Sequence, residues 1–188
     1  MLSCINIKLR LEVKRVNDIE LGKKIMVIGS PGSGKSTFSR QLSEILGIPL
    51  IHLDKVYWNS GWIETPKDEW KAKQELLISG DKWILDGNYG GTMDMRSNKA
   101  DTIINFELNR LVCFMSYIKR VITNLGKVRS DMPEGCPEKF DFKFAKYIWN
   151  FPKSSGKRNN ERLNTYKNKN IIVFCMRREA NKFLRELR

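Results

Sequence analysis

One nine-residue stretch, GSPGSGKST at 29–37, constrains this chain more than any other part of its sequence. The apolar run KKIMVIG at 23–29 leads into it and predicts a buried strand that ends at a glycine. Residues 36–46 follow with apolar side chains on one helical face, and Gly47 fits just beyond the end of that helix. The stretch has the pattern G-x-x-x-x-G-K-S/T, and a strand before it and a helix after it are the context that this pattern requires. The sequence therefore predicts a phosphate-binding loop.

The residue types of this loop suit a nucleotide. Glycines let the backbone curl around an anion with no Cβ in the way. The inward-pointing amides and the N-terminus of the following helix favour negative charge. Lys35 can reach β- and γ-phosphates, and the Ser36 hydroxyl can bind Mg²⁺, so we expect ATP and Mg²⁺ as cofactors. The expected nucleotide-binding residues of the loop are Gly29, Ser30, Pro31, Gly32, Ser33, Gly34, Lys35, Ser36 and Thr37.

The remaining pattern alternates strands with helices. Apolar runs that predict four more strands lie at 48–54, 82–87, 101–107 and 170–176. Helical patterns lie at 66–78, 108–125, 140–151 and 178–187. The second of these helices has an apolar stripe at positions 108, 111, 112, 115, 118, 122 and 125. Because the strands are continuous apolar runs, we predict an α/β fold, a three-layer αβα arrangement in which a five-stranded parallel sheet has helices on both faces.

The chain is expected to form one domain with a short segment before it. Its 188 residues contain no linker of domain-dividing length, so residues 23–188 are assigned to a single domain. Residues 126–139 are polar, with two prolines and two glycines, and predict a loop between two helices. Within residues 1–22, the stretch INIKLRLEVKRV alternates apolar and charged side chains, which predicts either an edge strand or a loose N-terminal extension without an assigned function.

Composition excludes some classes of protein. No stretch approaches the roughly 20 apolar residues of a membrane span, and charges interrupt the apolar N-terminus, unlike a signal peptide; we expect a cytoplasmic protein with no membrane partner. Cys4, Cys113, Cys136 and Cys175 are far apart in a chain with one histidine, which disfavours a structural zinc site and favours reduced thiols. The net charge of +13 favours polyanions, whether nucleotides, nucleic acid or anionic lipid.

Two aspartates follow apolar runs and are candidates for chemistry. Asp86 ends the run WILD, where a carboxylate can hold Mg²⁺ through water; the alternative is an ordinary Asp-Gly turn. Asp54 ends the run IPLIHLD. It either orients or deprotonates an acceptor hydroxyl, or it caps the segment that follows.

The stretch GSPGSGKST, followed by a strand that ends LDG, resembles the adenylate-kinase-like group of nucleoside and nucleotide kinases. More closely, the blocks HLDKVYW, WILDGNYGGTMDMR, DTIINFELNR, KVRSDMPEGCPEKF and FPK resemble the P-loop proteins named DNA topology modulation proteins, over about residues 24–187. The resemblance implies a kinase-type strand order and a mobile helical lid around 126–140. It also implies transfer of the ATP γ-phosphoryl group to a small nucleoside- or nucleotide-like acceptor.

Four arginines are candidates for contacts with phosphate or base. Adenylate kinase continues the strand equivalent to WILDG into Phe-Pro-Arg, whose arginine holds the acceptor phosphate; this chain continues Asn-Tyr-Gly-Gly, and its next arginine is Arg96. Arg120 and Arg129 flank the start of the lid, where arginines stabilise the charge of a transferring phosphoryl group. The alternative for each is a solvated or helix-capping charge. Arg177 follows the last strand, near the adenine in this fold, and its plane can stack on the base.

Three functions are compatible with the sequence. The first is an ATP-dependent phosphotransferase, with Lys35, Asp54, Arg96 and Arg129 as its catalytic residues. The second is a nucleotide-binding regulatory protein that affects DNA topology, for which the net charge is the support and no nucleic-acid-binding motif is present. The third is a nucleotide-binding protein without transfer activity.

The aromatic residues after Asp54 stack either on the acceptor or on neighbouring protein groups; these residues are Tyr57, Trp58 and Trp62.

Overall fold

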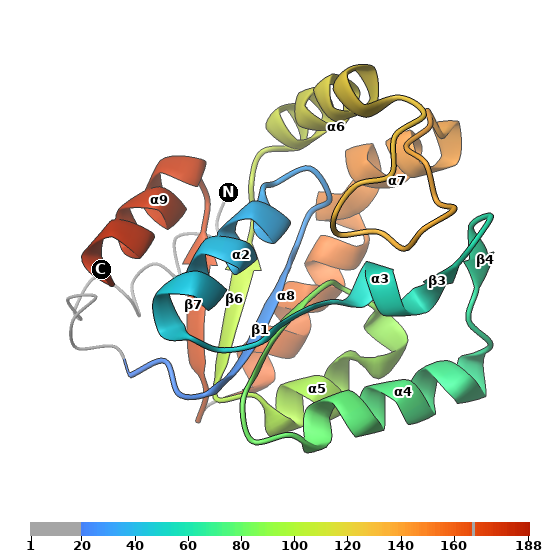
Figure 1. Ribbon diagram of the computed structural model, residues 1–188. Helices are drawn as coiled ribbons and strands as arrows, with labels where there is room; N and C mark the ends of the chain where they lie inside the picture. The colour runs from blue at the N-terminus through green and yellow to red at the C-terminus, as the bar shows by residue number, and fades with distance from the viewer. Residues whose placement is uncertain (1–19, 167) are drawn as a thin grey trace.

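The computed structural model describes residues 20–166 and 168–188 and has the predicted three-layer α/β architecture (Figure 1). Within these residues the central sheet has five parallel strands in the order β2-β5-β1-β6-β7. The strands are β1 (Lys24–Gly29), β2 (Leu50–His52), β5 (Trp83–Asp86), β6 (Thr102–Phe106) and β7 (Asn170–Phe174). The five predicted strands and their parallel pairing are thus confirmed.

Helices cover both faces of this sheet because its strands are apolar on both faces. In β1, Ile25 and Val27 face one core and Met26 and Ile28 face the other, as the alternation of side chains in a strand requires. The first core includes residues of α2 (Lys35–Leu46), α6 (Arg110–Asn124), α7 (Phe142–Asn150) and α9 (Arg177–Glu186). The second includes residues of α3 (Leu53–Tyr57), α4 (Lys67–Ser79), α5 (Met93–Lys99) and α8 (Ser155–Thr165).

Several short elements were not predicted from the sequence. The predicted strand 48–54 is limited to β2, and the chain turns at Leu53 into α3, so Asp54 lies in the first turn of a helix and does not end a strand. An antiparallel hairpin of β3 (Trp58–Asn59) and β4 (Ile63–Glu64) follows. Short 3-10 turns precede α5 (η2, Gly90–Thr92) and α8 (η3, Phe151–Lys153). The sequence of α8 has no apolar periodicity, because Leu163 is the one residue in it with a large apolar side chain.

The helix α6 lies where the sequence predicts a helix, but its buried face differs from its apolar stripe. Its buried residues are Cys113, Tyr117 and Val121. Most of the stripe faces solvent, and its exposed members are Leu111, Val112, Met115, Ile122 and Leu125. The loop predicted at 126–139 connects α6 to α7 and is held at its base by a bridge between Leu125 and Glu138. We call residues 125–141 the lid loop.

The expectation for residues 1–22 falls mainly outside the described residues, as does Cys4. Of the described part, Leu21 is buried in the first core, and its carbonyl accepts a hydrogen bond from the Thr102 hydroxyl. This contact leads the chain directly into β1. Among the described residues, no helix is long and apolar enough to cross a bilayer.

Candidate active site

The phosphate-binding loop runs from the end of β1 to the start of α2 with a backbone that only glycine fits at two points. Gly29 has φ of 128° and Gly32 has φ of 78°, both in the left-handed region. A Cβ would lie 2.3 Å from the Phe106 carbonyl oxygen at Gly29, and 2.3 Å from the Cys113 carbonyl oxygen at Gly32. The loop therefore forms a narrow backbone cradle next to β6 and α6, as an anion-binding loop requires.

Lys35 lies inside this cradle. Its side chain is buried, and Nζ donates a hydrogen bond to the Ser30 carbonyl at 2.9 Å. Burial lowers the pKa of Lys35, and the negative charges of Asp86 and Asp54 oppose that shift. The ammonium group therefore lies between the cradle and two carboxylates, where a nucleotide phosphate would meet it.

Asp86 ends β5 beside β1 and β2. Its Oδ2 is 2.9 Å from Nδ1 of His52, its partner in the register of the two strands. Burial alone would raise the pKa of Asp86, but the His52 hydrogen bond, the charge of Lys35 and a hydrogen bond to Ser36 outweigh burial and lower it. The other oxygen, Oδ1, is buried with no hydrogen-bond partner among the described residues. An ionised carboxylate with one fixed and one open oxygen, next to the Ser36 hydroxyl, fits a hydrated Mg²⁺.

Asp54 is held by a residue that the sequence did not single out. The Tyr89 hydroxyl donates to Asp54 Oδ1 at 2.5 Å. Burial raises the pKa of Asp54, Asp86 adds to this effect, and the Tyr89 hydrogen bond opposes it. Tyr89 itself has φ of 40°, which is unusual for a residue with a side chain. Asp54 therefore projects into the site from the first turn of α3 with its orientation fixed.

The structure corrects the expectation for Arg96. Its side chain is 0% exposed and lies behind the site, so it has no surface available to an acceptor. The guanidinium donates to the carbonyls of Gly87, Asn88 and Tyr89, the turn that replaces the adenylate kinase pattern. Within this turn, the Asn88 side chain exchanges two 2.9 Å hydrogen bonds with the backbone of Gly29. Arg96 thus supports the turn that connects Asp54 to the phosphate-binding loop.

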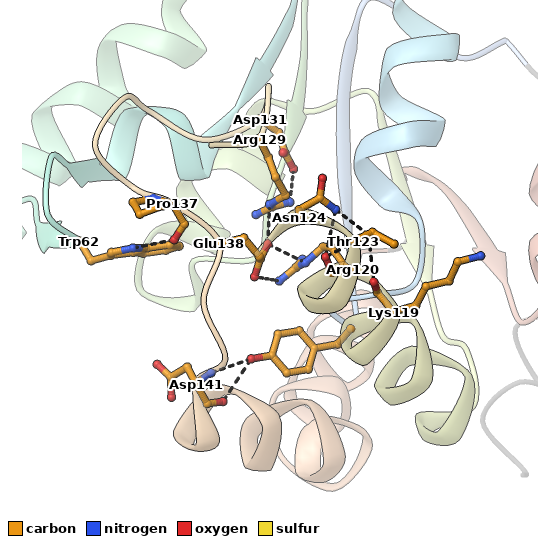
Figure 2. Close-up of polar contacts among 11 residues, drawn as sticks. Trp62, Lys119, Arg120, Thr123, Asn124, Arg129, Asp131, Pro137, Glu138 and Asp141 are labelled. Atoms are coloured by element: carbon orange, nitrogen blue, oxygen red, sulfur yellow. Dashed lines mark hydrogen bonds and ion pairs between the residues drawn. The ribbon is translucent and has the colours of Figure 1, made fainter. Parts of the chain in front are cut away.

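The two arginines expected at the lid converge on one carboxylate (Figure 2). Glu138 Oε2 lies 3.0 Å from Nε of Arg120 and 2.8 Å from Nε of Arg129, and Arg129 also pairs with Asp131 at 2.9 Å. Burial lowers the pKa of Arg120, and the charge of Arg129 adds to the effect. Both arginines line the cavity, so phosphate oxygens entering there would compete with Glu138 for them.

Arg177 and the aromatic residues that follow Asp54 also contact other protein groups. Arg177 donates to the Gly32 and Ser33 carbonyls, at 2.7 and 3.1 Å, and so braces the phosphate-binding loop while it lines the cavity. Tyr57 packs on Trp70 and Tyr89. Trp58 and Trp62 do line the cavity, and Trp62 donates from Nε1 to the Pro137 carbonyl of the lid loop at 3.3 Å (Figure 2).

These groups surround one cavity of about 1170 Å³ at the carboxyl edge of the sheet. The helix α8 also lines this cavity, with Arg158, Asn159 and Arg162, which sequence reasoning missed because α8 itself was not predicted. Lys139 of the lid loop also lines it. The cavity therefore brings together the phosphate cradle, the carboxylates of Asp54 and Asp86, and a basic wall formed by Arg158 and Arg162 of α8.

Comparison with known proteins identifies the family. No family model matches the chain. Shikimate kinases from two strains of Leptospira biflexa serovar Patoc are 32% identical over 122 residues, which cover 57% of this chain and 67% of theirs. The chain belongs to the shikimate kinase family. Its members are phosphotransferases, and so is this kinase.

Solved structures agree on the fold of this kinase. A gluconokinase from Sinorhizobium meliloti 1021 superposes with a TM-score of 0.55 at 15% identity, covering 90% of this chain and 91% of that one. A shikimate kinase from Acinetobacter baumannii, solved in complex with shikimate, gives a TM-score of 0.55 at 15% identity and covers 91% and 96%. The expected P-loop kinase fold is confirmed, and its relatives are kinases of small molecules.

Proposed function

We propose that this kinase transfers the γ-phosphoryl group of ATP, in the presence of Mg²⁺, to a hydroxyl group of a small anionic molecule. The observation that carries the proposal is that Asp54 lines the same cavity as the phosphate-binding loop and the arginines of α8. An acceptor hydroxyl beside Asp54 would share this cavity with Lys35, and Arg158 and Arg162, the second of which also pairs with Asp94, would offer charge to an anionic group of the acceptor.

Each residue has a role in this proposal. The amides of the phosphate-binding loop and Lys35 hold the nucleotide phosphates, and Ser36 with the open oxygen of Asp86 holds the metal. When bound, ATP would supply the phosphoryl group and Mg²⁺ would neutralise part of the charge around it. Asp54 accepts the proton of the acceptor hydroxyl at its carboxylate. Arg120 and Arg129 exchange Glu138 for phosphoryl oxygens, and the lid loop excludes water.

The acceptor class includes both hydroxy acids and nucleotides. The shikimate kinase and gluconokinase relatives support a hydroxy acid, and the sequence resemblance to nucleotide kinases supports a nucleoside monophosphate. The basic wall favours an anionic member of either group over a neutral nucleoside. We assign this activity to residues 23–188 acting as one domain.

An ADP-release assay with purified full-length protein tests the proposal. Shikimate, gluconate, nucleosides and nucleoside monophosphates are each offered with Mg²⁺ and ATP. We expect acceptor-dependent ADP release with an anionic compound, abolished in Lys35→Ala and reduced at least roughly 100-fold in Asp54→Asn. Mass spectrometry identifies the phosphorylated product. ATP binding without transfer to any of these compounds would reject the acceptor assignment, and failure to bind ATP at millimolar concentration would reject the function itself.

The net charge of +13 supports a second candidate, a nucleotide-binding protein that affects DNA topology. Titration of the protein with fluorescent duplex DNA at increasing salt separates the two. Binding that survives physiological salt supports the second candidate, and binding lost on modest addition of salt reflects nonspecific attraction of charge.

A further inference from the structure

The helices that flank the lid loop expose an apolar surface that the kinase reaction does not use. Leu111, Met115 and Ile122 lie on one face of α6, since spacings of four and seven residues return to the same side of a helix. Met115 is 62% exposed and Ile122 is 73% exposed. The α6 residues that line the cavity are Ser116, Tyr117, Arg120 and Asn124, so the apolar face points away from the active site.

This surface continues onto α7. Phe142 is 73% exposed, and Trp149, two turns further along the same face of α7, is partly exposed. Trp149 packs on Phe114, with ring centroids 5.7 Å apart, and the Arg110 guanidinium lies 4.5 Å from its ring centre, at the start of α6. We call this surface the α6–α7 crest, formed by Leu111, Met115, Ile122, Leu125, Phe142 and Trp149.

The charges on the two helices have one sign. The sequences of α6 and α7 contain no Asp or Glu, and their basic residues are Arg110, Lys119, Arg120, Lys143 and Lys146. Lys119 extends away from the ion pairs of the active site, on the other side of α6 (Figure 2). In the lid loop between the helices, Asp131 and Glu138 are buried in ion pairs, Asp141 caps α7, and Glu134 is exposed. The crest is therefore an apolar surface bordered by cations.

We propose that the α6–α7 crest binds the surface of an anionic lipid bilayer. An amphipathic helix with Leu, Phe or Trp on one side and Lys or Arg beside them lies in the interface of a membrane, with its apolar side chains below the headgroups. Anionic headgroups supply the negative charge that the crest lacks. The expectation that no membrane takes part rested on the absence of a spanning segment, and peripheral binding needs none.

The other occupants fit these observations less well. A second copy would place the same surface against itself, because a two-fold interface is self-complementary. Arg110, Lys119, Lys143 and Lys146 would then face one another without acidic partners. Nucleic acid matches the cations, but its phosphates and bases leave Met115 and Ile122 without apolar partners, and such interfaces are more polar than this one. A bilayer satisfies both the charge and the apolar area.

Vesicle flotation with the full-length protein tests the proposal. Vesicles of phosphatidylcholine alone are compared with vesicles that contain about one third phosphatidylglycerol. We expect the protein to float with the anionic vesicles and not with the neutral ones, and the bound fraction to fall as NaCl rises from about 0.1 M to about 0.5 M. We expect Ile122→Glu to reduce binding to the anionic vesicles at least roughly tenfold.

Leu76→Glu provides the matched control. Leu76 is 75% exposed on α4, a helix with three acidic residues, and its replacement changes the net charge by the same amount. This variant should bind vesicles as the wild type does. Thermal unfolding checks that both variants fold, and Ile122→Ser repeats the test with a milder change if Ile122→Glu does not fold.

Three results would overturn the proposal. The first is equal flotation with neutral and anionic vesicles, or none with either. The second is equal loss of binding in Ile122→Glu and Leu76→Glu, which would show that the change in net charge alone explains the loss. The third is a dimer in sedimentation velocity that Ile122→Glu dissociates, in a protein that does not bind vesicles; the crest would then be an interface between two copies.

Discussion

At the scale of single residues, the site holds two aspartates whose pKa values are shifted in opposite directions. The pKa of Asp86 is lowered because His52, Lys35 and Ser36 stabilise its charge against burial, whereas burial and the charge of Asp86 raise the pKa of Asp54. Two carboxylates whose environments separate their pKa values can take different roles. Asp86 is suited to stay ionised as a metal ligand, and Asp54 is suited to take and release a proton.

Replacing Tyr89 by phenylalanine tests this division. The Tyr89 hydroxyl donates to Asp54 and stabilises its ionised form, so its loss should raise the pKa of Asp54 further. A hydrogen bond to a charged group contributes about 1.5–3 kcal/mol, so its loss should be visible in the pH profile. Because the proposed base acts in its ionised form, the acid limb of kcat/KM should move to higher pH in Tyr89→Phe. An unchanged limb would show that Asp54 is not the titrating base.

At the scale of elements, the turn after β5 is the part that sequence reasoning interpreted least well. Its sequence departs from the adenylate kinase pattern, which suggested Arg96 as a ligand of the acceptor. The structure places Arg96 beneath the turn, where three carbonyls accept its hydrogen bonds. Burial lowers the pKa of Arg96 to about 9. Whether an arginine faces a cavity or supports a backbone depends on packing that one sequence does not contain.

Arg96→Met should destabilise the protein strongly. Removing the guanidinium leaves the carbonyls of Gly87, Asn88 and Tyr89 buried without their donors, which should lower the free energy of unfolding by about 3 kcal/mol or more. Urea unfolding measures this change. Arg178→Met is the control, because Arg178 is exposed on α9, and it should change stability by less than about 0.5 kcal/mol. Equal effects of the two variants would contradict the supporting role.

In the lid loop, Arg129 is expected to affect catalysis rather than stability. Arg129 lines the cavity and is paired with Glu138 and Asp131, so the role in transfer that we propose for it requires exchange of these carboxylates for phosphoryl oxygens. Arg129→Ala should lower kcat roughly 100-fold and change the nucleotide Kd much less. Lys127→Ala, an exposed cation of the same loop, should leave kcat unchanged. Steady-state kinetics with nucleotide-binding titrations distinguish this outcome from a general loss of nucleotide affinity.

The elements that could be predicted are those with a local signal. Continuous apolar runs predicted all five strands of the central sheet, and the glycine spacing predicted the phosphate-binding loop. The helix α8 could not be predicted, because its buried residues are Asn159 and Leu163 in an otherwise polar sequence. For the same reason, the two arginines of α8 that line the cavity were not recognised as site residues. The apolar stripe of α6 was visible in the sequence, but only the packing of Tyr117 and Val121 reveals that it faces outward.

At the scale of the whole molecule, the parallel sheet gathers the site at one edge. The phosphate-binding loop follows β1, Asp86 ends β5, Asp54 follows β2, and Arg177 follows β7. Ligands of open α/β sheets bind beyond the carboxyl ends of the strands for this reason. The site therefore depends on the strand order rather than on one segment, and a nucleotide bound there would contact loops from most of the sheet.

A nucleotide that contacts these loops only in the folded state should stabilise the whole domain. At about 100 times its Kd, a ligand adds about 2.7 kcal/mol to the free energy of unfolding. For a chain of this length, that corresponds to a rise in Tm of roughly 5–10 °C. We expect this rise in differential scanning fluorimetry with ATP and Mg²⁺.

EDTA should reduce this rise in Tm, since the open oxygen of Asp86 and the Ser36 hydroxyl are suited to bind the metal with the nucleotide. Asp86→Asn should lose the dependence on Mg²⁺ while Lys35→Ala loses the rise itself, and a rise that survives in Lys35→Ala would locate the nucleotide elsewhere in the protein.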